Sequence, residues 1–101
     1  MNQFGDHIRQ LRELKGLLQR QVANQLDIDT PMLSKIERGE RYAKREQVTI
    51  LSKIFQVPNE ELLSLWLADK VYQVLKDEEV ALKAIEVAEV EIINQMNQRV
   101  K

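Results

Sequence analysis

Hydrophobic residues recur at the spacing of an α-helix along almost the whole chain. Near the N-terminus, Phe4, Ile8, Leu11 and Leu14 follow one another at intervals of four, three and three residues, which places them on one helix face. Gly16 is expected to end this helix. No stretch fits the two-residue alternation of a β-strand better than the helical period, and glycine and proline are scarce. The pattern therefore predicts an all-α fold.

The stretch 19–39 combines two short amphipathic segments with a three-residue break at 27–29. Each segment has three apolar residues on its inner face: Val22, Ala23 and Leu26, then Met32, Leu33 and Ile36. Two short helices joined by a tight turn form a helix-turn-helix, whose second helix can enter the major groove of DNA. No other stretch of the sequence points to a function as specifically.

Local signals define the ends of these two segments. Asp27 is expected in the turn, where a positive φ is often needed and aspartate tolerates it better than most residues. Asp29 or Thr30 would cap the second helix, and Pro31 would fall in its first turn, where the missing N–H costs no hydrogen bond. Gly39 is expected to follow its last turn.

Two further helices are predicted after a charged loop over residues 40–46. The fourth helix has an apolar face formed by Val48, Leu51, Ile54 and Phe55. A break at 56–59 follows, with Asn59 as a candidate N-cap for a fifth helix that runs through Trp66. Together the five helices predict one compact domain over residues 1–68.

The C-terminal third, residues 69–101, has a different pattern. An apolar stripe recurs there at helical intervals: Ala81, Ile85, Ala88, Ile92 and Met96. The acidic run 77–79 suits either a break between two helices or an exposed turn of one long helix. The apolar face is wider than a solvent-backed helix needs, so we expect a dimer interface made of the stripe and Trp66, for which a place in the core is the alternative. Packing of the stripe against its own domain is the alternative.

Composition narrows the class of partner. The chain of 101 residues has a formal net charge of −1, but residues 1–45 carry nine Lys/Arg and six Asp/Glu (+3), and residues 46–101 carry six and ten (−4). The basic segment contains the helix-turn-helix, which favours nucleic acid as a partner. The chain has no cysteine, which excludes disulfides and is compatible with the cytoplasmic location that we expect. We expect no signal peptide, because no basic region precedes an apolar one at residues 1–4. We expect no membrane contact, because no apolar run approaches the roughly 18 residues of a membrane span.

Residue patterns for catalysis are absent from the sequence. His7 is the single histidine, and neither Ser34 nor Ser52 has an accompanying base. The acidic run 77–79 lacks the ligand spacing of a calcium loop. We therefore expect no catalytic residues, no metal site and no cofactor.

An ordered set of motifs runs through residues 4–63. It consists of Ile8-Arg9-x-Leu11-Arg12, Gly16-Leu17-x-Gln19, Val22-Ala23-x-x-Leu26, Ile28, Leu33-Ser34-Lys35-Ile36-Glu37-Arg38-Gly39, Leu51-x-x-Ile54-Phe55-x-Val57 and Glu61-Leu62-Leu63. These motifs resemble the phage-repressor/Cro type of helix-turn-helix domain, also called xenobiotic-response-element-like. The resemblance implies a five-helix DNA-binding domain to which the C-terminal helix or helix pair is added for dimerisation.

The resemblance also implies roles for individual residues. The outward positions of the third helix match base contacts: Thr30, Pro31, Ser34 and Lys35. The start of the second helix, the end of the third and the loop that follows match phosphate contacts: Gln19, Arg38, Arg41, Lys44 and Arg45. Arg38 alternatively caps the third helix, where a cation is favourable. Arg12 and Glu37 match a structural pair that ties the first helix to the end of the third.

Departures from the family pattern change the expected readout. Leu18 stands where a small polar cap is common, and Asp27 replaces the turn glycine. Thr30 and Pro31 are poor hydrogen-bond donors, so Lys35 becomes the main candidate reader, with guanine O6 and N7 as its acceptors. Thr30 and Pro31 would press against a thymine methyl group.

We therefore expect a homodimeric, sequence-specific transcriptional regulator of prokaryotic or phage type that binds double-stranded DNA at a palindromic operator. It would repress by exclusion or activate by touching RNA polymerase. The motifs also resemble restriction–modification controllers, which we rank first, and antitoxins, whose further partner would be a toxin. The alternative is a protein-interaction module with weak or no DNA binding, which Pro31 and the acidic C-terminal segment suggest.

Overall fold

The computed structural model describes residues 1–99, and all regular structure in that range is helical. Its six helices are α1 (Gln3–Leu14), α2 (Gln19–Gln25), α3 (Thr30–Glu37), α4 (Arg45–Phe55), α5 (Asn59–Leu75) and α6 (Ala81–Arg99). The prediction of an all-α fold with an added C-terminal helix is confirmed. No helix within residues 1–99 is long and apolar enough to cross a membrane.

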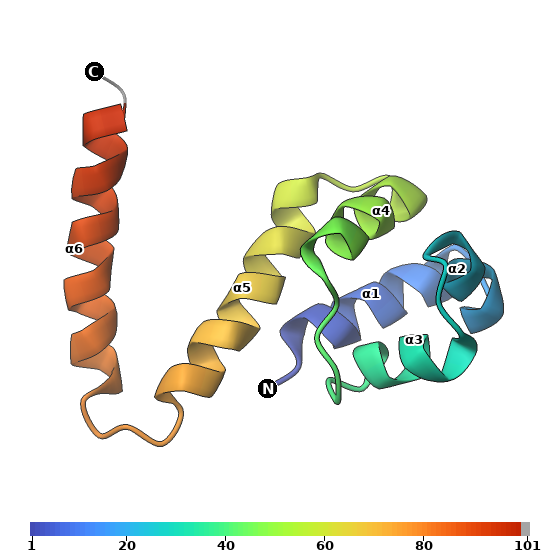
Figure 1. The fold of residues 1–101 in the computed structure, drawn as a ribbon, viewed down its shortest axis with the longest axis horizontal. Coiled ribbons are helices and arrows are strands. Elements are labelled where there is room, and N and C mark those ends of the chain that lie inside the picture. Colours follow the sequence, from blue (N-terminus) through green and yellow to red (C-terminus); the bar gives the residue numbers. More distant parts are fainter. Residues whose placement is uncertain (100–101) are drawn as a thin grey trace.

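Helices α1 to α5 pack around one core, with α1 against α3, α4 and α5, and α2 against α3 (Figure 1). The apolar faces expected from the helical spacing supply the most deeply buried side chains: Ile8, Val22, Leu33, Val48, Leu51 and Leu62. Helices α2 and α3 have only 7 and 8 residues, too few to be stable alone in water. Their positions are therefore fixed by burial of their apolar faces in the shared core.

The predicted turn residues adopt left-handed backbone conformations. Gly16, Asp27 and Gly39 have φ values of 66°, 57° and 77°. Asp29 is the residue that caps α3, because its Oδ1 accepts a hydrogen bond from the backbone N–H of Met32 at 2.8 Å. The sequence signals for the ends of α2 and α3 are thus confirmed.

Two helix starts differ from the prediction. Helix α4 begins at Arg45, which places Arg45 in a first turn and not in a loop. The side chain of Gln47 accepts a hydrogen bond from the backbone N–H of Lys44 at 2.8 Å, and this bond satisfies a donor at the helix start. Asn59 is the first residue of α5 and not its cap, because Pro58, with φ of −59°, leads directly into the helix.

Two side chains of α5 hold it against the rest of the domain. The Trp66 indole is 6% exposed, and its Nε1–H donates to the carbonyl oxygen of Ala43 at 2.8 Å. The indole therefore fills the core and finds its polar partner within its own chain, while a part for Trp66 in a dimer interface stays a prediction. The buried carboxylate of Asp69 accepts hydrogen bonds from the backbone N–H groups of Gln3 at 3.0 Å and Phe4 at 2.9 Å. It caps α1 from a distant segment of the sequence.

Helix α5 continues past residue 68 to Leu75, so the division expected between 1–68 and 69–101 falls inside a helix and stays a prediction. A short turn over residues 76–80 then leads into α6, so the acidic run lies at a break between two helices and not within one long helix. Helix α6 projects away from the body of the domain and forms a V with α5 (Figure 1). It contains no buried residue.

Candidate DNA-binding surface

Helices α2 and α3 form the predicted helix-turn-helix. Val22, Ala23 and Leu26 anchor the first helix and its end in the core, and Leu33 and Ile36 anchor the second. Because these five side chains are all 5% exposed or less, the angle between the two helices is set by core packing. The opposite side of α3 is left facing solvent.

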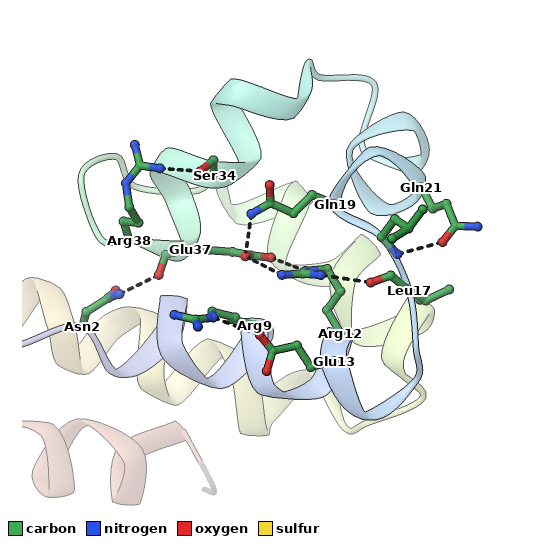
Figure 2. Close-up of polar contacts among 11 residues, drawn as sticks. Asn2, Arg9, Arg12, Glu13, Leu17, Gln19, Gln21, Ser34, Glu37 and Arg38 are labelled. Carbon is green, nitrogen blue, oxygen red and sulfur yellow. Dashed lines mark hydrogen bonds and ion pairs between the residues drawn. The ribbon is translucent and has the colours of Figure 1, made fainter.

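A polar cluster joins three helices at the end of α3. The Glu37 carboxylate is 3% exposed and accepts hydrogen bonds from Arg12 Nε at 2.7 Å and Arg12 Nη2 at 3.1 Å. Gln19 Nε2 donates to Glu37 Oε1 at 2.9 Å, and Arg12 Nη1 donates to the carbonyl oxygen of Leu17 at 3.0 Å (Figure 2). The structure therefore brings Arg12 and Glu37 together and adds Gln19 to them.

The chemistry of this cluster indicates a structural role. The hydrogen bond from Arg12 to Glu37 is the largest cause that raises the pKa of Arg12 above its ordinary value, followed by the opposing effect of burial. The Arg12 guanidinium is charged, as arginine side chains in proteins are, and serves as the counterion of the buried carboxylate. Because Arg12 is in the last turn of α1, Gln19 begins α2 and Glu37 ends α3, the cluster fixes the helix-turn-helix against α1.

Gln19 is therefore placed differently from its implied role. Its side-chain amide is half-buried and is hydrogen-bonded to Glu37. An amide NH₂ group has two hydrogens, so one remains for another acceptor such as a phosphate oxygen. A phosphate contact by Gln19 stays a prediction.

The outward residues of α3 differ in how free they are. Pro31 and Lys35 are both exposed, but Pro31 has no hydrogen-bond donor, whereas Lys35 carries an ammonium group. Ser34 already has a hydrogen-bond partner. The Ser34 hydroxyl accepts a hydrogen bond from Arg38 Nη1, and Arg38 Nε also donates to Glu40 (Figure 2 shows the first of these). Arg38 is thus folded back over its own helix, and its charge is partly neutralised before any phosphate arrives.

Four cations among the predicted contact residues remain available within the described residues. They form no ion pair within residues 1–99: Lys35 on α3, Arg41 and Lys44 in the loop after α3, and Arg45 at the start of α4. A cation without an acidic partner can bind a phosphate or a base edge without first breaking a contact. This set is the electrostatic component of the candidate surface.

Two contributors to the site were not found from the sequence. Asn2 Nδ2 donates to the backbone carbonyl oxygen of Glu37 at 2.7 Å, across the interface between α1 and α3. At Gly5 the two helices approach so closely that a methyl group there would lie 2.6 Å from the carbonyl oxygens of Ile36 and Glu37. A glycine inside a helical pattern is the one signal that points to such an approach.

The fold and this surface define the class: an all-α helix-turn-helix domain whose second helix is rigidly held and faces solvent, followed by an additional helix. A family model described as a helix-turn-helix domain matches residues 3–65. The chain belongs to this family.

A curated relative agrees with that family. The HTH-type transcriptional activator BcrR of Enterococcus faecalis is 40% identical to this chain over 62 residues, which is 61% of the chain and 30% of BcrR. The matched segment is therefore less than a third of the length of that relative. No solved structure matches the chain significantly.

Proposed function

We propose that this protein is a sequence-specific DNA-binding regulator of transcription that binds an inverted-repeat operator as a homodimer. The observation that carries the proposal is the contrast between the two sides of α3. One side is fixed by the core and by the Glu37 cluster. The cations Lys35, Arg41, Lys44 and Arg45 have no acidic partners within residues 1–99. A preorganised helix with free donors is suited to the major groove.

The proposed DNA contacts are of two kinds: contacts that read base edges and contacts that hold phosphates. Lys35 would donate to guanine O6 or N7, and Pro31 and Thr30 would contact a thymine methyl group. Ser34 keeps its hydroxyl hydrogen for a base or phosphate oxygen, since Arg38 uses it only as an acceptor. Arg41, Lys44 and Arg45 would hold phosphates, with Gln19 and Arg38 joining them after small side-chain changes.

A homodimer would present two copies of α3 to half-sites about 34 Å apart, or a multiple of that distance. Such a protein regulates by excluding RNA polymerase or by contacting it, and the relative is named an activator. A controller of a restriction–modification operon fits the same small architecture. Binding of DNA upstream of its own gene, at two salt concentrations, tests the proposal, because phosphate contacts make affinity fall steeply with salt.

Lys35→Ala is expected to reduce discrimination between the operator and unrelated DNA, by about 1–3 kcal/mol or roughly 5- to 150-fold. The physical reason is the loss of the base-edge donor. Fluorescence anisotropy with both DNAs gives the ratio of affinities. Equal weakening on both DNAs would show that Lys35 binds phosphate and does not read a base.

Arg45→Ala is expected to weaken binding to all sequences alike and to lower the slope of log affinity against log salt by about one. Arg45 is exposed at the start of α4, and its substitution removes one phosphate contact. Lys83→Ala on α6 is the control, because it removes the same charge outside the helix-turn-helix. Should Lys83→Ala lower the slope equally, only the net charge of the protein matters.

If no sequence is preferred in an unbiased oligonucleotide selection, the interaction-module alternative is the correct function.

A further inference from the structure

Helix α6 and the end of α5 expose an unusual amount of apolar surface. Between residues 71 and 96, eleven large hydrophobic side chains are 40% exposed or more. An apolar groove of about 500 Å³ lies between the two helices, lined by Val71, Val74 and Leu75 from α5 and by Ile85, Ala88 and Ile92 among others from α6. Figure 1 shows α5 and α6 as the two arms of a V, and the residues that line the groove come from both arms.

The groove needs an occupant because α6 gains almost nothing from its own chain. A helix of 19 residues without a buried side chain depends on its intrinsic propensity, whereas helices in proteins gain most of their stability from packing of an apolar face. No segment within residues 1–99 covers the stripe. The occupant of the groove therefore lies outside the described residues.

The order of side chains along the stripe indicates which molecule. Ala81, Ile85, Ala88 and Ile92 alternate small and large. When a second copy of α6 runs in the opposite direction, Ala81 lies opposite Ile92 of that copy and Ile85 lies opposite its Ala88. Each large side chain then meets a small one, which is the interdigitation that close packing requires. A parallel pair in register would instead place alanine against alanine and isoleucine against isoleucine.

We infer that the groove binds α6 of a second copy of this chain, antiparallel to the first α6, so that α5 and α6 of both copies form a four-helix unit. The inference rests on the homodimer of the proposed function and specifies its contact. A two-fold axis gives both copies the same contact, which is the requirement of an isologous interface.

The exposed apolar area of the groove is close to the apolar part of a standard dimer interface. Complete burial of one such side chain removes on the order of 100 Å² of apolar surface from water. The exposed fractions of the large apolar side chains that line the groove and its continuation beside α5 then correspond to roughly 400 Å² for each copy. A standard interface buries about 800 Å² per partner, of which somewhat more than half is apolar.

Charge excludes DNA as the occupant of the groove. Residues 46–101 carry ten acidic and six basic side chains, and Glu89 lines the groove itself. A phosphate backbone would be repelled there. The groove and the helix-turn-helix surface therefore serve different partners.

Sedimentation equilibrium of the full chain tests the contact. Wild-type protein should be a dimer at micromolar concentration. Ile85→Glu should raise the dissociation constant about 100-fold or more, because the symmetric interface would bury two carboxylates. Val87→Glu is the matched control, since Val87 is 58% exposed but lies about 200° around the helix axis from Ile85. A monomeric wild type, or equal dissociation by both variants, would overturn the inference.

The direction of pairing has its own test, because the natural chain has no cysteine. A mixture of Ala81→Cys and Ile92→Cys proteins should form a mixed disulfide dimer on mild oxidation. Neither variant alone should cross-link, because each residue lies about 16 Å along the axis from its own counterpart, beyond the reach of a disulfide. Cross-linking of the single variants without the mixed product would show a parallel pair and contradict the inference.

Failure of this inference is distinguishable from failure of the proposed function. A protein that is monomeric but still prefers one DNA sequence would contradict the α6 contact and leave the proposal of DNA reading by α3 standing. Dimeric protein with the mixed disulfide but no sequence preference would keep the contact and remove the regulatory function.

Discussion

Glu37→Ala is expected to lower the free energy of unfolding by about 3–5 kcal/mol, because it leaves the Arg12 guanidinium without a counterion in a nearly buried site. The Arg12 side chain is 13% exposed and makes two of its hydrogen bonds to this carboxylate. The whole free energy of unfolding of a domain of this size is about 5–15 kcal/mol. The melting temperature measured by circular dichroism should fall on the order of 10–40 °C.

Glu13→Ala is the matched control for this loss. Glu13 also accepts a hydrogen bond from an arginine, Arg9 Nε at 3.1 Å, but both side chains are more than half exposed. Exposed pairs contribute about 0–1 kcal/mol. A melting temperature that falls no further for Glu37→Ala than for Glu13→Ala would remove the cluster as a stabilising element.

Gly5→Ala is the second large effect that we expect. In an ordinary helix interior this change stabilises by about 1 kcal/mol. Here the new methyl group would meet backbone oxygens at the end of α3, 2.6 Å away, and backbone cannot rotate aside as a side chain can. Helix α3 must shift relative to α1, and we expect a loss of about 1–3 kcal/mol or more. The shift should also weaken binding to operator DNA.

Gly16→Ala separates this steric effect from the general effect of substituting a glycine. A methyl group at Gly16 meets nothing within 4 Å, but the residue has φ of 66°. Its cost comes from the left-handed conformation alone, about 1–2 kcal/mol, and DNA affinity should be unchanged. Stabilisation by Gly5→Ala would mean that α1 and α3 are not held as closely as the structure shows.

Some of the candidate surface could be predicted from the sequence. The apolar spacing of α3 identifies Leu33 and Ile36 as inward residues, and this leaves Lys35 on the outward side without any knowledge of the fold. The hydrogen bonds of Gln19 and Ser34 could not be predicted in this way. They depend on which rotamers the neighbours adopt, and the neighbour of Gln19 is 18 residues away.

Contacts between distant segments account for the other differences. The residue type and the helical spacing of Trp66 suit either a core or an interface residue. Only the hydrogen bond to the carbonyl oxygen of Ala43 shows that the indole points inward. Asp69 looks like an exposed acidic residue, although it caps α1 from 65 residues away. The sequence places Arg45 in a loop because the hydrogen bond from the Lys44 N–H to Gln47 leaves only a weak local pattern.

The sequence by itself determined the helices, the turn residues between them and the separation into a basic and an acidic segment. These features arise from interactions within a few residues: apolar spacing, capping side chains and left-handed turns. The tertiary structure decided that Gly5 packs directly against the end of α3, that Trp66 is a core residue and that the stripe on α6 lies open beside α5. These features depend on distances between segments remote in sequence, which packing of the whole core sets and no local pattern contains.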